Sequence, residues 1–184
     1  MTDNNTERHG TAAGVLGAAT VAMGLIAGVF YIFACAIMPS LARSDDRVFI
    51  EVMQNINDVI QNPVFFLSFL GALVLTAVAA RQSRGAPNRR WVFAALAAYT
   101  LVLVVTMAVN IPLNNDLADA GDPSQIADPA AVRDRFEDTW VAWNVVRALL
   151  STFALACLAR ALFLYRRPQT SAYLESAAGS SASR

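Results

Sequence analysis

Four long hydrophobic stretches constrain this chain more than any other feature. They cover residues 12–38, 63–80, 91–109 and 141–164, and the first three contain no charged residue. A helix needs about 20 predominantly apolar residues to cross the hydrocarbon core of a bilayer. Unpaired backbone groups are too costly in lipid, so each stretch has to be helical. We therefore predict an all-α membrane protein with four transmembrane helices.

The composition agrees with this prediction. The chain is 56% hydrophobic and only 15% charged, whereas roughly a quarter of the residues of a soluble domain are charged. The first stretch is too long for the hydrophobic region of a signal peptide, which is typically about 7–15 residues. We expect one transmembrane domain over residues 12–165, with disordered tails at 1–11 and 166–184.

Residues 44–61 predict an amphipathic helix rather than a fifth span. The segment is charged, but its apolar residues recur at the i, i+3, i+4 and i+7 positions of one helix face. These residues are Phe49, Val52, Met53, Ile56, Val59 and Ile60. The helix is expected to lie on the bundle or on the bilayer surface.

Asparagine, aspartate and proline residues predict the helix boundaries. Asn62-Pro63 and Asp128-Pro129 each combine an N-cap residue with a proline at the first helical position. Pro39 is expected to end the first span, and the segment 110–116 is expected to break the third, because proline cannot donate a backbone hydrogen bond. From Pro129 we predict one continuous helix to about Tyr165. At 1.5 Å per residue it is about 55 Å long, so its first turns should project from the membrane.

The arginine distribution predicts the orientation. Nine of the 14 basic residues lie in the N-terminal tail, the 81–90 loop and the segment from Arg160 onward. Arginine-rich connections face the cytoplasm. We therefore expect a multi-pass protein of the cell membrane with both termini in the cytoplasm, and an outer cap made by the amphipathic helix and the acidic 110–139 connection.

Arg147 is a charge well inside the fourth span, where it costs at least a few kcal/mol unless it is compensated. Trp140, Trp143 and Asn144 share its helix face because they lie seven, four and three residues before it. The ends of spans two and three bring further polar residues to a similar depth. Those residues are Asn57, Asn62, Asn110 and Asn114.

A polar pocket near the outer leaflet is one interpretation of this cluster. In the other, the asparagines and tryptophans are ordinary interface and capping residues or link the helices, and Arg147 extends to the surface. Asp58 and Asp116 are the nearest carboxylates in sequence, and each is a candidate either to pair with Arg147 or to act as a general base.

Several functional classes have no support. No phosphate-binding loop, nucleophile elbow or metal motif is present, and the single histidine, His9, lies in the N-terminal tail. Cys35 and Cys157 lie in apolar stretches, where thiols behave as small hydrophobic groups. No basic surface with interleaved aromatics is predicted, so nucleic acid is not an expected partner. The expected partners are the lipid bilayer and a lipophilic small molecule, and the sequence does not indicate an oligomeric state.

The sequence resembles the anthrone oxygenase-like family of small four-span membrane proteins over about residues 12–165. The resemblance rests on Asn57, Asn62-Pro63, Thr106, Asn110-Ile111-Pro112-Leu113-Asn114-Asn115-Asp116-Leu117, Trp140, Trp143-Asn144 and Arg147. It implies oxidation of an anthrone-like aromatic to a quinone without a cofactor or metal. In that case Trp140 and Trp143 would form walls, Arg147, Asn110 and Asn144 would stabilise an oxyanion, and Asp58 or Asp116 would take the proton. The alternative is a non-catalytic membrane protein that binds a lipophile or acts as an accessory subunit.

The predicted orientation can be tested with a cysteine introduced by Asp122→Cys, in the acidic connection, in a Cys35→Ser background. A thiol reagent that does not cross membranes should label it when added outside intact cells. Labelling only after the cytoplasmic side is opened would contradict the orientation.

Overall fold

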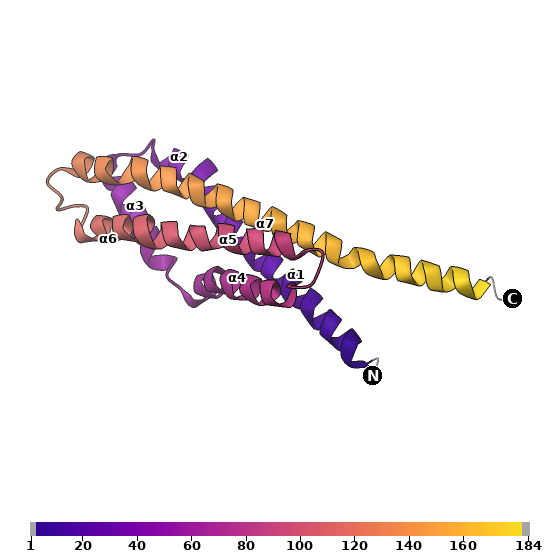
Figure 1. Ribbon diagram of the computed structural model, residues 1–184. Coiled ribbons are helices and arrows are strands. Elements are labelled where there is room, and N and C mark those ends of the chain that lie inside the picture. Colours follow the sequence, from indigo (N-terminus) through magenta and orange to yellow (C-terminus); the bar gives the residue numbers. More distant parts are fainter. Residues whose placement is uncertain (1–2, 182–184) are drawn as a thin grey trace.

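The computed structural model describes the backbone of residues 3–181 and the side chains of residues 10–165. Within that range all of the regular secondary structure is helical, and four long helices form a bundle (Figure 1). They are α1 (Asp3–Ile32), α4 (Pro63–Gln82), α5 (Arg89–Val105) and α7 (Pro129–Ser181). The predicted all-α fold with four membrane-spanning helices is confirmed.

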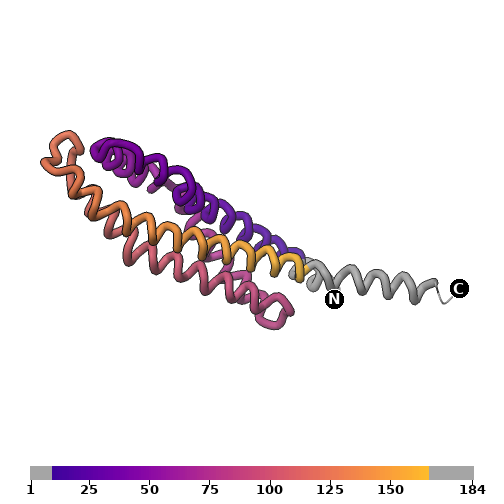
Figure 2. The backbone as a smooth tube through the Cα atoms, turned by 90° about the horizontal axis from the view of Figure 1, so that it is seen from above, coloured from indigo at the N-terminus to yellow at the C-terminus, as the bar shows by residue number. Residues whose placement is uncertain are grey.

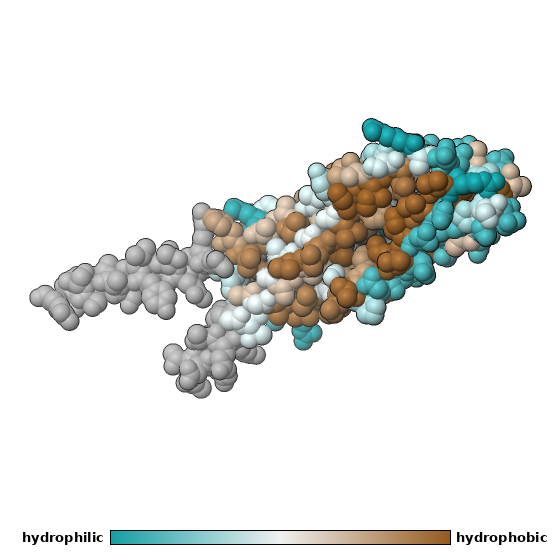
Figure 3. Space-filling model, turned by 180° about the vertical axis from the view of Figure 1, so that it is seen from behind, coloured by the Kyte–Doolittle hydropathy of each residue, from teal (hydrophilic) through white to brown (hydrophobic). Residues whose placement is uncertain are grey.

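Four segments are long and apolar enough to cross a bilayer, and they match the four predicted spans. They are Gly10–Leu41, Pro63–Gln82, Arg89–Asp119 and Pro129–Tyr165. Figure 3 shows apolar side chains across the middle of the bundle and hydrophilic ones at the cap end. Gly10 and Thr11, which were assigned to a disordered tail, belong to α1. The rest of that tail and residues 166–184 lie outside the fully described part of the chain.

Small and aromatic side chains hold the long helices together. α7 packs against α1 and α5, and α4 packs against α1 and α5, as the tube in Figure 2 also shows for α7. Ala19, Ala95 and Ala154 are fully buried at these contacts, where small residues let helix backbones approach closely. The Tyr99 hydroxyl donates to the Phe69 carbonyl at 2.8 Å and fastens α5 to α4.

Two proline positions correct the predicted helix boundaries. Neither Pro39 nor the 110–116 segment interrupts its helix. Instead, the π-helical turn η1 (Phe33–Ile37) leads into α2 (Met38–Leu41), and η2 (Thr106–Asn110) leads into α6 (Ile111–Asp119). Each proline is the second residue after its π-helical turn.

The π-helical turns explain how the helices tolerate proline. A proline in a regular helix removes one hydrogen bond and collides with the carbonyl four residues earlier. Here the preceding N–H groups bond five residues back, Met38 to the Phe33 carbonyl and Ile111 to the Thr106 carbonyl. The extra residue in the turn shifts the carbonyl ladder ahead of the proline. Such bulges are frequent at functional sites.

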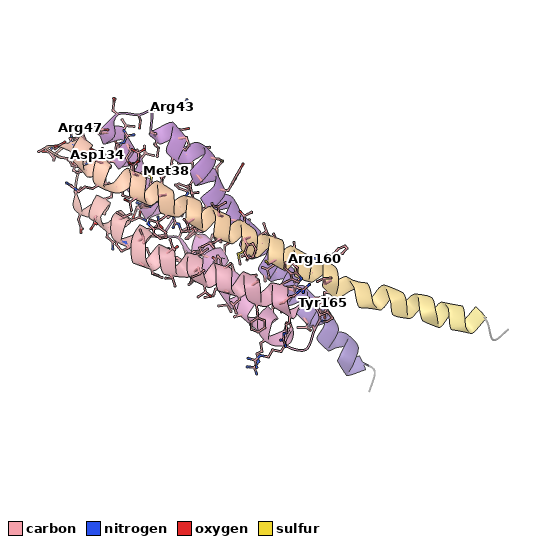
Figure 4. The ribbon with its side chains drawn as sticks, turned by 45° about the horizontal axis from the view of Figure 1, so that its top comes forward. Met38, Arg43, Arg47, Asp134, Arg160 and Tyr165 are labelled. Atoms are coloured by element: carbon pink, nitrogen blue, oxygen red, sulfur yellow. The ribbon has the colours of Figure 1, made fainter. Side chains whose placement is uncertain are left out.

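The amphipathic helix is confirmed as α3 (Asp46–Val59), which closes one end of the bundle with α6. Its apolar face is buried in a second, separate core beside the first turns of α7. The buried members of this core are Phe33, Met38, Phe49, Ile50, Met53, Leu117, Ile126, Phe136 and Trp140. In Figure 4, Arg43, Arg47 and Asp134 lie at this cap end, whereas Arg160 and Tyr165 lie at the opposite end of the bundle.

The predicted caps of α4 and α7 are also confirmed. The Asn62 side chain accepts hydrogen bonds from the Val64 and Phe65 N–H groups, both at 3.0 Å. The Asp128 side chain accepts one from the Ala131 N–H at 3.1 Å. These caps fix where both helices begin, and hence where α7 meets α3.

Arg133 joins the cap to α7. Its guanidinium donates to the Ala42 and Ser44 carbonyls and to Asp46 and Glu137. It also lies over the Phe49 ring, with Cζ 4.6 Å from the ring centroid. One side chain thus connects α7 to the chain before α3 and to α3 itself.

We predict that Arg133→Ala destabilises the cap by about 1–3 kcal/mol, because it leaves half-buried acceptors without their donor. The measurements are the thermal unfolding midpoint in detergent and the rate of proteolysis in the 42–45 link. Arg135→Ala is the matched control, since Arg135 is an exposed arginine on the same turn. Equal loss of stability in the two variants would contradict this role of Arg133.

Candidate functional site

The site is organised around the Arg147 guanidinium in the middle of α7. The residue is only 6% exposed. Its Cζ lies 4.5 Å from the centroid of the Phe30 ring and 5.4 Å from that of Trp140. Within residues 10–165 the ion pairs are those of Arg133, so Arg147 has no carboxylate partner there. Its positive charge is held by ring faces and an amide instead.

Asn144 supplies that amide. Its Oδ1 accepts a hydrogen bond from Arg147 Nη2 at 3.0 Å, one helical turn away. Its Nδ2 donates to the Phe30 carbonyl of α1 at 3.1 Å. This second bond fixes the amide so that its oxygen faces the guanidinium, and Asn144 is fully buried. The pair therefore also ties α7 to α1.

Trp140 is fixed from the opposite side by η2 and α6. Its Nε1 donates to Asn114 Oδ1 at 2.8 Å, and its carbonyl accepts from Asn110 Nδ2 at 3.5 Å. Its ring packs against those of Phe33 and Phe136. The two π-helical turns thus meet at this tryptophan, Phe33 from η1 and Asn110 from η2.

A cavity of about 280 Å³ lies beside Arg147. Its walls come from α1, α4, η2, α6 and α7, and the last turn of α3 with the residues that follow it forms its roof. The lining residues include Phe30, Phe33, Asn57, Gln61, Phe65, Phe66, Phe69, Leu70, Thr106, Met107, Asn114, Asn115, Trp140, Asn144 and Arg147. An apolar, aromatic lining with a few convergent polar groups is typical of a small-molecule site.

Two hydrogen-bond donors at the cavity have no partner among the described residues. They are Asn57 Nδ2 and Arg147 Nε, and both atoms are buried. Leaving a buried donor unpaired costs about 1–3 kcal/mol, and more for a charged group. A ligand with acceptor oxygens, ideally an anionic one beside Arg147, would satisfy both donors.

The structure brings half of the ten predicted site residues together at the cavity. Asn57, Asn114, Trp140, Asn144 and Arg147 line the cavity. Asn110 is buried behind it against Trp140, and Asn62 caps α4 instead of facing the cavity.

The remaining predicted residues lie elsewhere. Trp143 is 38% exposed and does not line the cavity. Asp58 and Asp116 are exposed, and Asp116 lines a different hollow between α6 and α7. Among the residues that line the cavity there is neither a carboxylate nor an imidazole.

The aromatic wall of the cavity was missed by the sequence analysis. Phe65, Phe66 and Phe69 follow the Asn62 cap directly, and Phe65 stacks on Phe69 with ring centroids 5.5 Å apart. Three phenylalanines within five residues, next to a cluster of polar residues, could have indicated an aromatic binding wall from the sequence. Met107 was missed, and Thr106 was named only as part of the family resemblance and given no role at the site, because the π-helical turn that carries both residues was not foreseen.

The described residues contain no group of three or more His, Cys, Asp or Glu side chains with the arrangement of a metal site. The polar groups at the cavity are amides, one hydroxyl, one indole N–H and one guanidinium. Neutral amides and a fixed cation are suited to holding an oxyanion or a carbonyl oxygen.

A family model described as "Anthrone oxygenase" matches residues 53–157. The matched segment begins within α3 and ends within α7, and so includes most of the cavity wall together with Arg147. Neither the curated proteins nor the solved structures give a match to this chain.

We predict that Asn144→Leu destabilises the protein by about 2–3 kcal/mol, because the buried guanidinium loses its hydrogen-bond acceptor. Adding Arg147→Met should recover part of that loss, since removing both partners of a buried charged pair costs less than removing one. The thermal unfolding midpoints of the two single variants and the double variant measure this coupling. Additive midpoint shifts would contradict it.

Proposed function

This chain belongs to the anthrone oxygenase family, and from that premise we propose that it oxidises a flat, lipophilic aromatic ketone of the anthrone type with molecular oxygen and without a cofactor. The observation that carries the proposal is Arg147, a buried cation with no carboxylate partner among residues 10–165, beside an aromatic cavity. The reaction has to develop negative charge on a ring oxygen. The cavity offers one fixed positive charge for it.

The chemistry follows from the acidity of the substrate. Loss of one proton from the central CH2 group of an anthrone gives an enolate whose charge lies on the carbonyl oxygen. The enolate carbon transfers electrons to O2, and a C–O bond forms to give a hydroperoxide after protonation. Loss of water, with the second C–H bond broken, leaves the quinone carbonyl. One oxygen atom of O2 is retained and the other leaves as water.

Arg147 is the proposed oxyanion stabiliser. It stabilises the enolate more than the neutral ketone, because the favourable charge interaction exists only after ionisation. Beside a mostly apolar lining the effective dielectric constant is lower than in water, so this preference is larger than in solution. Asn144 positions the guanidinium, and the free Asn57 Nδ2 is a second donor for a substrate oxygen at the roof.

The aromatic side chains hold the ring system. Phe30 and Trp140 already flank the guanidinium, and Phe65 and Phe69 form a stacked pair in the wall. Flat hydrophobic surfaces of this kind favour offset-stacked or edge-on contact with another aromatic ring. The substrate class that fits is therefore aromatic and apolar, with oxygen substituents at its edge.

The proton acceptor in this proposal is water or hydroxide rather than Asp58 or Asp116. Both carboxylates are exposed and neither lines the cavity. Gln61 and Asn115 are exposed lining residues at the cap side, where water can reach the substrate. Arg147 favours loss of the proton by stabilising the charge that remains.

The proposal places the cavity near the outer leaflet of the cell membrane, with both termini in the cytoplasm. The arginine-rich loop at 81–90 supports this orientation, because it lies at the end of the bundle opposite the cap. A substrate made or stored in the membrane would meet the cavity without crossing into bulk water.

The absence of a carboxylate or imidazole from the cavity lining favours a second candidate function, the binding of a lipophilic aromatic without turnover. In that case the same two free donors would hold a phenolate or quinone oxygen. The two functions differ in oxygen consumption but not in ligand class.

We predict that Arg147→Met lowers the rate of anthrone oxidation by about 10²–10³-fold, the usual effect of losing one oxyanion donor. The assay follows quinone absorbance and O2 uptake in proteoliposomes, and with ¹⁸O2 the label should appear in the new carbonyl. Arg160→Met is the matched control, since Arg160 is an exposed arginine further along α7.

An unchanged rate in folded Arg147→Met protein would contradict the catalytic role. Binding of a hydroxyanthraquinone to the wild-type protein without any oxygen uptake would support the second candidate instead.

A further inference from the structure

We propose that the cavity is reached sideways from the bilayer, through a slot between the first two turns of α4 and the π-helical turn η2, by an uncharged, flat lipophilic aromatic. This rests on the proposed function for the identity of the substrate. The route itself rests on the contacts and exposure of the helices that border the cavity.

On the side of the cavity away from the cap, α4 is joined to α5, the helix that leads into η2. The Tyr99 hydroxyl donates to the Phe69 carbonyl, and the two rings pack edge to face with centroids 6.1 Å apart. Beyond this contact, toward the cap, residues 10–165 show no hydrogen bond between the start of α4 and either η2 or α6. The cavity lies between these segments, which supply lining residues from both sides.

The lining residues that remain exposed show what borders the opening. Phe66 and Leu70 of α4 are 43% and 46% exposed, and Met107 of η2 is 58% exposed. All three are apolar, and all three line the cavity. They therefore connect the outer surface of two spanning helices with the interior.

The depth of these residues places the opening in lipid. Leu70 lies seven residues into the span that begins at Pro63, which is about 10 Å along a helix. Met107 belongs to the uncharged apolar stretch 91–109, on the side of Asn110 away from the cap. This part of both helices therefore contacts the acyl chains of the bilayer. The exposed polar lining residues, Gln61 and Asn115, lie toward the cap instead.

Arg147 determines which form of the molecule uses this route. An anion would not leave water for the acyl chains without a large cost. The neutral ketone would partition into lipid, pass the slot and lose its proton only beside the guanidinium. The slot thus selects neutral aromatics, while Arg147 retains them after ionisation.

The test uses a small aromatic diazirine that dissolves in the bilayer, with full-length protein in liposomes and mass spectrometry of the labelled residues. In wild-type protein, light should attach the probe inside the cavity, at Trp140, Phe33 or Phe30, as well as on the lipid-facing surface. Leu70→Trp and Met107→Trp narrow the slot and should each reduce interior labelling several-fold.

Leu67→Trp and Val104→Trp are the matched controls, because both residues are exposed one turn away on the same helical segments and neither lines the cavity. They should leave interior labelling unchanged, and surface labelling at Val74 and Leu101 should be equal in all variants. The proposal is overturned if wild-type protein carries no interior label, or if the slot variants and the controls label alike.

The probe reports access without turnover, so the route and the reaction are tested separately. Interior labelling that depends on Leu70 and Met107, in a protein that consumes no oxygen with an anthrone, supports the slot and rejects the proposed catalysis. Quinone formation that is unaffected by Leu70→Trp and Met107→Trp, together with unchanged labelling, rejects the slot and leaves the proposed catalysis in place.

Discussion

The buried guanidinium of Arg147 is the interaction on which the cavity end of the bundle depends. A charge in the middle of a span costs from about 3 to more than 10 kcal/mol, depending on how it is relieved. One hydrogen bond to a charged group returns about 1.5–3 kcal/mol, and a desolvated cation–π contact about 2 kcal/mol. Asn144, Phe30 and Trp140 together therefore offset the lower half of this range but not its upper end.

This balance explains why so many elements converge on one side chain. Asn144 needs the Phe30 carbonyl to orient it, and Trp140 needs Asn114 to hold its ring over the guanidinium. Asn114 is in place because α6 continues the line of η2 past Pro112 instead of breaking away. A regular helix at η2 would place Asn110 and Asn114 at other angles. The π-helical turn is thus part of what makes the buried charge tolerable.

The sequence predicted those features that depend on local chemistry or on hydrophobicity summed over a span. The four spans, the amphipathic α3 and the caps at Asn62 and Asp128 are of this kind. The continuation through Pro39 and Pro112 was not predictable by local rules, because proline alone indicates a break and only the neighbouring helices favour the π-helical alternative. At the site, Asp58 was the prediction that failed in a similar way. It follows Asn57 in sequence, but Asn57 lines the cavity whereas Asp58 is exposed.

The lack of a carboxylate at the cavity has a physical consequence for any function of this site. An aspartate beside Arg147 would form an ion pair and occupy the charge permanently, because a buried pair is costly to separate. Amides and aromatic rings stabilise the guanidinium without neutralising it. The positive charge therefore stays available to a ligand, and it favours the ionised form of any weakly acidic molecule that reaches it. In the proposed reaction, the lack of a carboxylate at the cavity argues against a protein side chain as the base. The same lack leaves Arg147 free to stabilise a substrate that becomes an anion when it loses its own proton.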